Sequence, residues 1–537
     1  MRVVELPRLV RTVRHLRPSQ VYGQVRKRVR GFAPLPALAD DAPWLGQRLA
    51  TTPPPQHTSH LGPGRYRFLN REVDVRHAGR IDYDYLGEGK LWAYNLNYFA
   101  YLWQAGMRND LRRALMLKYA ARLPTLREGQ EPYPTSLRAI HWTKALLTGA
   151  STAAAIAEEQ VLRQSLFAQA RQLSRNVETH LAGNHVLENA FALCALGCVF
   201  DDSSLRALAL PLLERELAEQ ILPSGGHYER SPMYHAILTE RALDVYNVAT
   251  GHRGADFADQ LAHALEQVLP EMLHYLSAVA YPDGTWPLLN DAAPGIALPT
   301  AAILSYAQAL GLRATAPAAG GPDETYARIK AGDFDLHFDV GAIGPDYIPG
   351  HAHCDSLAVV CRHRGAPWLV DTSVSTYENC ARRRRERSTR AHNTVQLDEY
   401  EQSEIWGAFR VGRRARPTGL QVLPKGYRAA HTGYAHLGAQ HTRTVEREGR
   451  SVSILDEVRL GSCRRATARW HFDHSVEPEL TAPSEVQTGD ATLAFAGDVD
   501  GVKIVPYKQA TGWNQVADAS CVEVTFRSTL RTEMHAG

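Results

Sequence analysis

The sequence has no long apolar run, no paired cysteine motif and no marked excess of charge of either sign. No stretch approaches the roughly 20 consecutive apolar residues that a membrane-spanning helix needs, so no transmembrane segment is predicted. The 60 basic and 57 acidic residues leave a formal charge of only +3, which argues against nucleic acid as a partner. Seven cysteines without a CxxC pair argue against a disulfide framework and indicate reduced, mostly structural thiols.

The N-terminal segment is rich in arginine and lacks the uninterrupted apolar stretch of a secretory signal. With the unpaired cysteines, this predicts a cytoplasmic protein, and the periplasm is the alternative. The basic, amphipathic opening is expected to form a solvated helix. Contact with a membrane surface or a partner is the alternative for this segment.

The chain of 537 residues is 44% hydrophobic and 22% charged, which is a globular composition. It is too long for a single core, because cores rarely exceed roughly 300 residues. From about residue 90 to about 315, apolar residues recur every three or four positions, as in Leu213, Leu217 and Ile221. This pattern predicts consecutive antiparallel helices that bury their apolar faces in a solenoid or a closed toroid.

The pattern changes after the Ala-, Pro- and Gly-rich residues 314–322, which we interpret as a linker. Beyond it, apolar residues alternate with polar ones, as in Phe334, Leu336 and Phe338, and this period of two predicts strands of an antiparallel sandwich. We therefore expect three parts: a basic, partly helical extension over residues 1–80, a helical domain over 81–320 and a sheet domain over 321–537.

Two histidines stand two positions apart between two expected strands. Residues at this spacing in an extended chain face the same side, so His351 and His353 can project together. Asp371 closes a later strand, and His392 follows it. Two imidazoles and a carboxylate suit zinc, and a purely structural histidine pair is the alternative.

Two further clusters stand at expected helix starts. Asn184 and His185 open one helix, where Asn184 could simply be a cap. Ser231 predicts another N-cap, which places Tyr234 in the first turn with His235 beside it. The helix dipole favours an anion there, so we expect a phenolate to form more readily than in free tyrosine. A ring packed with its hydroxyl in water is the alternative.

Aromatic and arginine side chains suggest contacts with a sugar. Tyr133, Arg138 and Trp142 lie within a few turns of one another. An arginine fork and an aromatic surface match a sugar carboxylate and the apolar face of a pyranose ring. The arginine-rich residues 382–387 could line a groove for an anionic polymer, or they could form a solvated charged face.

The order of these motifs resembles the heparinase II/III and alginate lyase group of polysaccharide lyases, over about residues 80–480. The resemblance implies an α + β multidomain protein, with an incomplete (α/α)6 toroid followed by an antiparallel β-sandwich and the polymer bound between them. It rests on Pro-Tyr-Pro-Thr-Ser-Leu-Arg at 132–138, Asn184-His185, Tyr234, Pro282-Asp283-Gly284, His351-x-His353, Trp368-Leu369-Val370-Asp371 and His392-Asn393-Thr394.

The resemblance also implies roles for individual residues. Asn184 and His185 would face the carboxylate of a uronate, Tyr234 would be the catalytic acid and base, and His351 would be a second base. The other expected site residues are His353, Asp371 and His392 as ligands of a structural zinc ion, and Tyr133, Arg138, Trp142, His235 and Arg390 as substrate contacts.

These residue types fit β-elimination in a uronate-containing polymer. The C5 hydrogen of a uronate is a weak acid while the neighbouring carboxylate stays charged, so the reaction needs donors that neutralise this carboxylate, together with a base and an acid. A uronate C5-epimerase would use the same residues. A non-catalytic glycan-binding protein of polysaccharide assembly and a zinc hydrolase are further alternatives. Without a secretory signal, the expected substrate is the cell's own capsule, O-antigen or exopolysaccharide.

Overall fold

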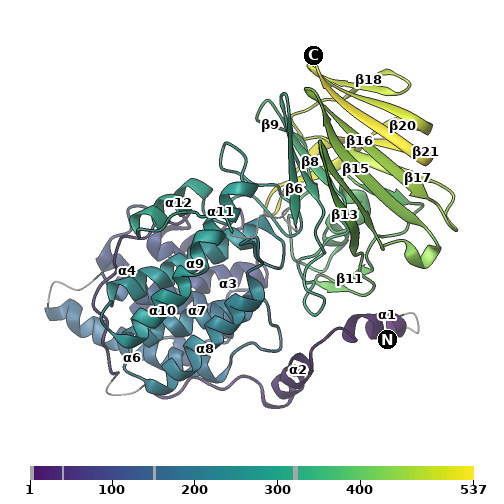
Figure 1. Cartoon of the computed structure of the whole chain (residues 1–537). Helices are drawn as coiled ribbons and strands as arrows, with labels where there is room; N and C mark the ends of the chain where they lie inside the picture. The colour runs from purple at the N-terminus through teal and green to yellow at the C-terminus, as the bar shows by residue number, and fades with distance from the viewer. Residues whose placement is uncertain (1–4, 39–41, 149–152, 318–324) are drawn as a thin grey trace.

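The computed structural model describes residues 5–38, 42–148, 153–317 and 325–537. Figure 1 shows a helical body beside a body built of strands, with two separate N-terminal helices along one edge. The expected α + β multidomain fold is therefore confirmed. Of the residues 314–322 that we interpreted as a linker, residues 318–322 lie outside the described part of the chain.

The helical body is an incomplete toroid in which inner and outer helices alternate along the chain. The inner helices α3, α5, α7, α9 and α11 each contact the next inner helix, and the outer helices α4, α6, α8 and α10 do the same. Its helices are α3 (Lys90–Tyr98), α4 (Asn109–Ala120), α5 (Pro132–Leu146), α6 (Ala153–Arg175), α7 (Asn184–Val199), α8 (Ser203–Gln220), α9 (Pro232–Gly251), α10 (Asp256–Glu266), α11 (Leu269–Val279) and α12 (Thr300–Ala309).

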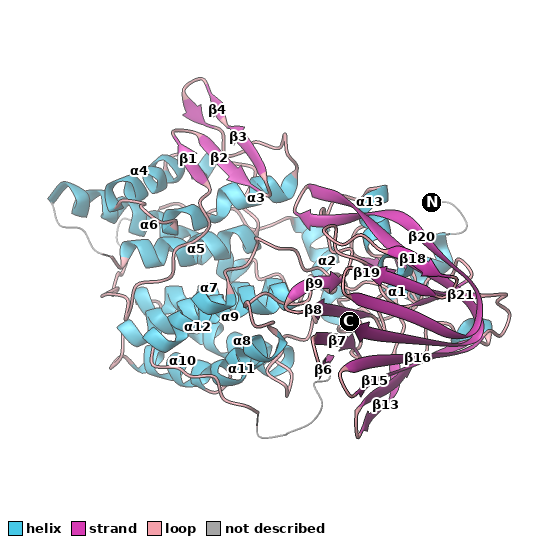
Figure 2. Cartoon of the chain, turned by 90° about the horizontal axis from the view of Figure 1, so that it is seen from above, coloured by secondary structure: helices cyan, strands magenta, loops and turns pink. Residues whose placement is uncertain are grey.

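Composition explains which helices are central. In α7 every residue except His185 is buried, and α9 is buried along most of its length. A helix that is apolar on all sides must be packed on all sides, so these two helices form the middle of the body. A small sheet of β1 (His60–Gly62), β2 (Arg65–Phe68) and β3 (Arg71–Asp74) lies beside the helices (Figure 2). Tyr66 and Phe68 of β2 belong to the same buried core.

The strand body is a sandwich of two antiparallel sheets. Phe338 from the smaller sheet and Trp470 and Phe526 from the larger one belong to the same buried core. The smaller sheet has the order β6 (Tyr326–Ala331), β7 (Phe334–Asp339), β8 (Val359–His363) and β9 (Ala366–Leu369). The larger sheet contains β10 (Val395–Leu397), β13 (Pro417–Leu423), β14 (Gly426–His431), β15 (Gln440–Glu448), β16 (Ser451–Arg459), β17 (Ala466–His471), β18 (Glu479–Ala482), β19 (Glu485–Thr488), β20 (Ala491–Gly512) and β21 (Gln515–Ala536).

The N-terminal helices α1 (Glu5–Val13) and α2 (Pro18–Arg30) lie outside both bodies (Figure 1). Helix α1 is held to the strand body by an ion pair of 2.6 Å between Arg11 and Glu404. Arg17, just before α2, pairs with Glu219 of the helical body.

No helix in the described ranges is long and apolar enough to cross a membrane. All seven cysteines are free thiols, and six of them are buried.

Candidate active site

The candidate site lies where the two bodies meet, and α7 supplies its first residue. The main-chain N–H of Asn184 donates to Glu229 Oε1 at 2.8 Å, and its side-chain amide donates to Glu229 Oε2 at 2.9 Å. Gly183, the residue before the helix, has φ +62°, and a Cβ there would collide with Glu229 Oε1. Glycine therefore allows Glu229 to approach the start of α7. The Asn184 side chain is used for this contact, not as a helix cap.

Helix α9 supplies Tyr234 in the position that the sequence predicts. The hydroxyl oxygen of Ser231 accepts from the Tyr234 main-chain N–H at 3.3 Å, as expected of an N-cap. The tyrosine ring lies against the imidazole of His351, with 4.1 Å between ring centroids. The Tyr234 hydroxyl is 3.1 Å from the hydroxyl of Tyr377. Asn184 Nδ2 is 3.3 Å from His351 Nε2, so the structure brings Asn184, Tyr234 and His351 together.

The expected ease of forming a phenolate at Tyr234 is wrong. Burial raises the pKa of Tyr234 well above its ordinary value, and Tyr377, Asp291 and Glu229 raise it further. These effects oppose the helix dipole, which favours an anion by only about 1 kcal/mol. The phenol of Tyr234 therefore carries its proton at neutral pH.

Asp291 connects both histidines of the His351-x-His353 pair. Asp291 Oδ2 is 2.8 Å from His351 Nδ1, and Oδ1 is 2.9 Å from His353 Nε2, so the two rings face the same side, as the sequence predicts. Arg383 donates to both oxygens of the same carboxylate. Burial alone would raise the pKa of Asp291, but Arg383 and the two histidines outweigh it and hold this pKa well below its usual range. The ionised Asp291 therefore favours the proton on His351 Nδ1, which leaves a lone pair on Nε2.

Glu229 places a second carboxylate beside the base. Its Oε2 is 3.3 Å from His351 Nε2 and only 1% of the Glu229 side chain is exposed. Burial raises the pKa of Glu229, but His351, His227 and the two hydrogen bonds from Asn184 lower it more, so that its pKa lies below the ordinary value. Glu229 thus adds a second negative charge next to His351, on the side of the ring opposite Asp291.

His185 lies at the same helix start but faces a different partner. Its Nδ1 is 3.1 Å from Glu178 Oε2, and its ring packs against Tyr133 with 4.5 Å between centroids. Burial lowers the pKa of His185, but Glu178, followed by Glu229 and Glu188, raises it above the ordinary value. Tyr133 and His185 are both partly exposed, so they remain candidates for substrate contact.

The expected zinc ligands lie close together, and two of them offer a free nitrogen. His353 Nδ1 and His392 Nε2 are buried without a hydrogen-bond partner, and the ring centroids are 5.4 Å apart. Asp371 accepts from His392 Nδ1 at 2.6 Å, the arrangement by which a carboxylate orients a ligand histidine. Within the described ranges, no three His, Cys, Asp or Glu side chains are already grouped around one ion position. The two histidines fit a metal, and the third ligand stays a prediction.

Three expected substrate contacts are wrong, because their side chains are buried inside the helical body. Arg138 is completely buried and donates to Gln169, Thr135 and two main-chain carbonyls. Trp142 is completely buried and packs edge-on against Phe99. His235 is buried with Nε2 2.9 Å from the Met272 carbonyl. Their donors and rings therefore stabilise the toroid.

The arginine-rich residues 382–387 divide between two roles. Arg383 and Arg387 are buried: the first pairs with Asp291, and the second donates to the Ala352 carbonyl. Arg382, Arg384 and Arg385 are exposed, as is Arg390, whose contact with substrate stays a prediction. Both alternatives for residues 382–387, a groove lining and a solvated charged face, are therefore wrong for the two buried arginines and stay open for the exposed ones.

Sequence reasoning missed Glu229, Asp291 and Tyr377 and misassigned Arg383. Asp291 follows the apolar pair Leu288-Leu289 and Asn290, and a charged residue two positions after an apolar pair, close to the Pro-Asp-Gly turn, was the available signal. Tyr377 carries no such signal, because only the fold brings its hydroxyl to Tyr234.

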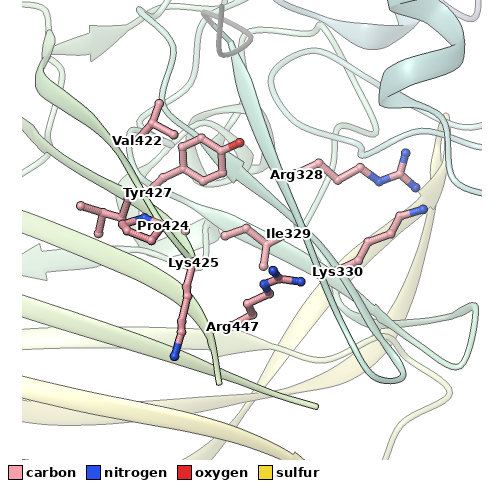
Figure 3. Close-up of a pocket in the computed structure, with 10 residues that line it drawn as sticks. Arg328, Ile329, Lys330, Val422, Pro424, Lys425, Tyr427 and Arg447 are labelled. Carbon is pink, nitrogen blue, oxygen red and sulfur yellow. The ribbon is translucent and has the colours of Figure 1, made fainter. Parts of the chain in front are cut away.

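A separate basic pocket lies in the strand body. It has a volume of about 410 Å³ between β6 and the β13–β14 hairpin and shares no residue with the site around His351. Figure 3 shows Lys330, Lys425 and Arg447 around it, with the ring of Tyr427 above. Its cations are therefore not part of the histidine-tyrosine site.

The fold and this site define the class of the protein. The sequence profile described as heparinase II/III N-terminus matches residues 154–309, and the profile described as heparinase II/III-like, C-terminal, matches residues 313–524. The chain belongs to the heparinase II/III-like family. Among curated proteins, no relative matches significantly by sequence.

Solved structures agree with the fold. A heparinase III superposes with a TM-score of 0.64 at 14% identity, covering 86% of this chain and 80% of that chain. The heparinase III encoded by BT4657 gives 0.62 at 15% identity, covering 87% and 82%. The heparan sulfate lyase HepC from Pedobacter heparinus gives 0.59 at 16% identity, covering 88% and 82%.

Proposed function

We propose that this chain is a polysaccharide lyase that cleaves a uronate-containing anionic polysaccharide by β-elimination. The observation that carries the proposal is the convergence of Asn184, Tyr234 and His351, with the last two rings 4.1 Å apart. A non-catalytic binder would have no need for an acid and a base held together. Membership of the heparinase II/III-like family supports the same conclusion.

The uronate carboxylate must first be neutralised so that its C5 proton can leave. The two Asn184 amide hydrogens point at Glu229 and His351, at 2.9 and 3.3 Å. The longer contact is the easier one to exchange for a substrate oxygen. The raised pKa of His185 keeps a positive charge available one residue from Asn184 and within electrostatic range of Glu229. Asn184 and His185 together would stabilise the enediolate that develops as the proton leaves.

Two neighbouring groups then move the protons. His351 Nε2, with its lone pair directed by Asp291 on Nδ1, takes the C5 proton. Tyr234 carries its proton because of its high pKa, so it donates this proton to the departing O4. The C4–O4 bond breaks, its electron pair is taken up by O4, and a C4–C5 double bond forms in the uronate. Tyr377 holds the Tyr234 hydroxyl in place for this transfer.

A uronate C5-epimerase is the second candidate, because the same base would remove the C5 proton and Tyr234 would return a proton to the opposite face. The rings of Tyr234 and His351 lie against each other, so both groups reach the substrate from the same side. This arrangement favours elimination over epimerisation.

The deciding experiment is to incubate the full chain with a panel of uronate polymers that includes the source cell's own capsule, O-antigen or exopolysaccharide. An ultraviolet signal from the unsaturated uronate, lost in Tyr234→Phe, would support the lyase. No such signal together with C5 deuterium uptake from heavy water would favour the epimerase. Binding of polymer with neither reaction, unchanged in Tyr234→Phe, would overturn the catalytic proposal in favour of a glycan-binding protein.

We also propose that His353, Asp371 and His392 take part in a structural zinc site. The free His353 Nδ1 and His392 Nε2 nitrogens support this site. A zinc ion bound there would cross-link the loop that carries His353 to the segment that carries His392. Metal analysis of the purified protein tests this: stoichiometric zinc that disappears in His392→Ala is expected. Metal-free wild-type protein with an unchanged unfolding temperature after zinc addition would refute it.

A further inference from the structure

The N-terminal strap, residues 6–38, has the most one-sided charge of the chain. It contains eight arginine and lysine residues and no aspartate or glutamate, and the one acidic residue next to it is Glu5 at the start of α1. Arg8, Arg11 and Arg17 are used in ion pairs with Glu404 and Glu219. The basic residues of α2 itself, residues 26–28 and 30, form no ion pair with any described part of the chain. The strap therefore keeps uncompensated positive charge on its surface.

Helix α2 contacts the protein through one face. Gln20 is buried and its side-chain amide donates to the Tyr347 carbonyl at 3.2 Å. Gly23 lies so close to His180 that a Cβ at this glycine would come within 2.7 Å of the histidine Cβ. Residues three apart share a helix face, so Gln20 and Gly23 define the side of α2 that is turned to the protein.

The opposite face of α2 is apolar and exposed. Val21, Val25 and Val29 are 49%, 58% and 78% exposed, and their spacing of four places them in one stripe. At about 100° per residue this stripe points roughly 160° away from the contact face. Tyr22 extends the stripe, and Arg28 flanks it. A solvated surface helix has no reason to turn its valines outward in a row.

Helix α1 repeats this arrangement independently. Arg11 pairs with Glu404, and the Thr12 hydroxyl accepts from the Trp406 indole N–H at 2.9 Å, so this side faces the strand body. Leu6, Val10 and Val13 are all exposed, and by the same helical geometry they lie on the far side. Both helices thus bind the protein with one face and present apolar side chains with the other, along one edge of the molecule (Figure 1).

We propose that the strap docks on an anionic lipid surface. The exposed valines and Tyr22 would enter the interface between headgroups and acyl chains, and Arg28 and its basic neighbours would contact the lipid phosphates. An apolar stripe flanked by uncompensated cations on a helix is the chemistry that recognises such a surface. A soluble polyanion would use the cations and leave the apolar stripe exposed to water.

The test is sedimentation of the full chain with vesicles of phosphatidylcholine alone or mixed with phosphatidylglycerol. Binding to the anionic vesicles is expected to be on the order of ten-fold tighter or more, because several cations lie near the surface. Val25→Ser/Val29→Ser should reduce this binding at unchanged charge, and Arg26→Ser/Arg28→Ser should reduce it at unchanged apolar area. Val422→Ser, a valine on β13 that is 61% exposed, is the matched control and should bind as the wild type does.

Two outcomes would overturn the proposal. Equal binding to neutral and anionic vesicles would show that the basic residues of the strap do not recognise anionic lipid. Binding that survives Val25→Ser/Val29→Ser and is matched by dextran sulfate would assign the strap to soluble polyanions instead. All substituted side chains are exposed, so unchanged unfolding temperatures should accompany every variant. Lyase activity is not needed for either readout, so failure of the proposed function would leave this test intact.

Discussion

Replacing Asp291 by asparagine should separate the two roles of this carboxylate. Four donors converge on it: Nδ1 of His351, Nε2 of His353 and two guanidinium nitrogens of Arg383. Asparagine offers one oxygen, and its N–H₂ group would face one guanidinium nitrogen of Arg383, which cannot accept from it, and one histidine nitrogen, which accepts only after losing its own proton. At least one nitrogen of Arg383 would then face a donor, and its buried positive charge would lose its counter-ion.

The expected magnitudes follow from these contacts. Removing one partner of a buried ion pair costs about 3–5 kcal/mol of stability. Because the folded-state pKa of Asp291 is depressed, its contribution is present above about pH 4 and is lost as pH falls toward the depressed pKa. The variant should therefore lose stability at neutral pH and show a flatter dependence at low pH. His351 would also lose the acceptor that directs its lone pair, so kcat should fall by about 10²–10⁴.

The strand body offers a matched control for the loss of stability. Asp456 is also buried and accepts from a histidine, His441, and from an arginine, Arg443, at 2.7 to 2.9 Å. Burial raises its pKa, but Arg443 and His441 outweigh burial and lower it to about 2. Asp456→Asn should cost similar stability, measured by denaturant unfolding, and should leave kcat per folded molecule unchanged. Equal loss of kcat in both variants, or wild-type kcat in Asp291→Asn, would refute the role assigned to Asp291.

Three further predictions concern the tyrosine pair, His185 and the buried Arg138. Tyr234→Phe should lower kcat by about 10²–10⁴ with little change in polymer affinity. Tyr377→Phe should lower kcat less, by roughly ten-fold, because it removes only the hydrogen bond of 3.1 Å to Tyr234. Equal decreases of kcat in the two variants would contradict this order. Glu178→Gln should lower the pKa of His185, which Glu178 raises. Because protonated His185 is lost as pH rises, KM should begin to increase at a lower pH than in the wild type. Identical dependence of KM on pH in the two proteins would contradict this role of His185. Arg138→Ala should destabilise the helical body by several kcal/mol, because it leaves four buried hydrogen-bond acceptors without their donor and each unsatisfied buried group costs about 1–3 kcal/mol. KM per folded molecule should stay constant, and a selective rise in KM would restore Arg138 as a substrate contact.

The fold could be predicted from local patterns because each pattern had one structural solution. The apolar spacing around Leu213 and Leu217 lies within α8, and the alternation at Phe334, Leu336 and Phe338 lies within β7. The N-cap at Ser231 was also recognisable, since the preference of serine for this position is local. The positions of the N-terminal helices were harder to predict, because contacts with distant residues place α1 and α2 against the two bodies.

The site could be predicted only where a short segment carried the signal. Asn184, Tyr234 and His351 stand in recognisable segments, and the structure brings them together. Arg138 has the same residue type whether it binds sugar or is buried with carbonyls around it, so sequence could not decide between these roles. Asp291 is important because two other segments, one with His351 and His353 and one with Arg383, converge on it, and convergence of segments distant in sequence is a property of the tertiary fold alone.

Asp291 also couples the acid-base pair to the expected zinc ligands. Each of its oxygens faces one histidine, so the same negative charge places a proton on His351 Nδ1 and on His353 Nε2. The opposite nitrogen of each ring then keeps its lone pair. On His351 this is Nε2, which points to the reacting side. On His353 it is Nδ1, which is buried without a hydrogen-bond partner near His392. His353→Ala should therefore abolish zinc binding and reduce kcat by no more than about ten-fold, because Arg383 still holds the carboxylate on His351. Asp291→Asn should impair both. If His353→Ala lowers kcat as much as Asp291→Asn while the protein stays folded, the two histidines act as one unit and the division of roles at Asp291 is wrong.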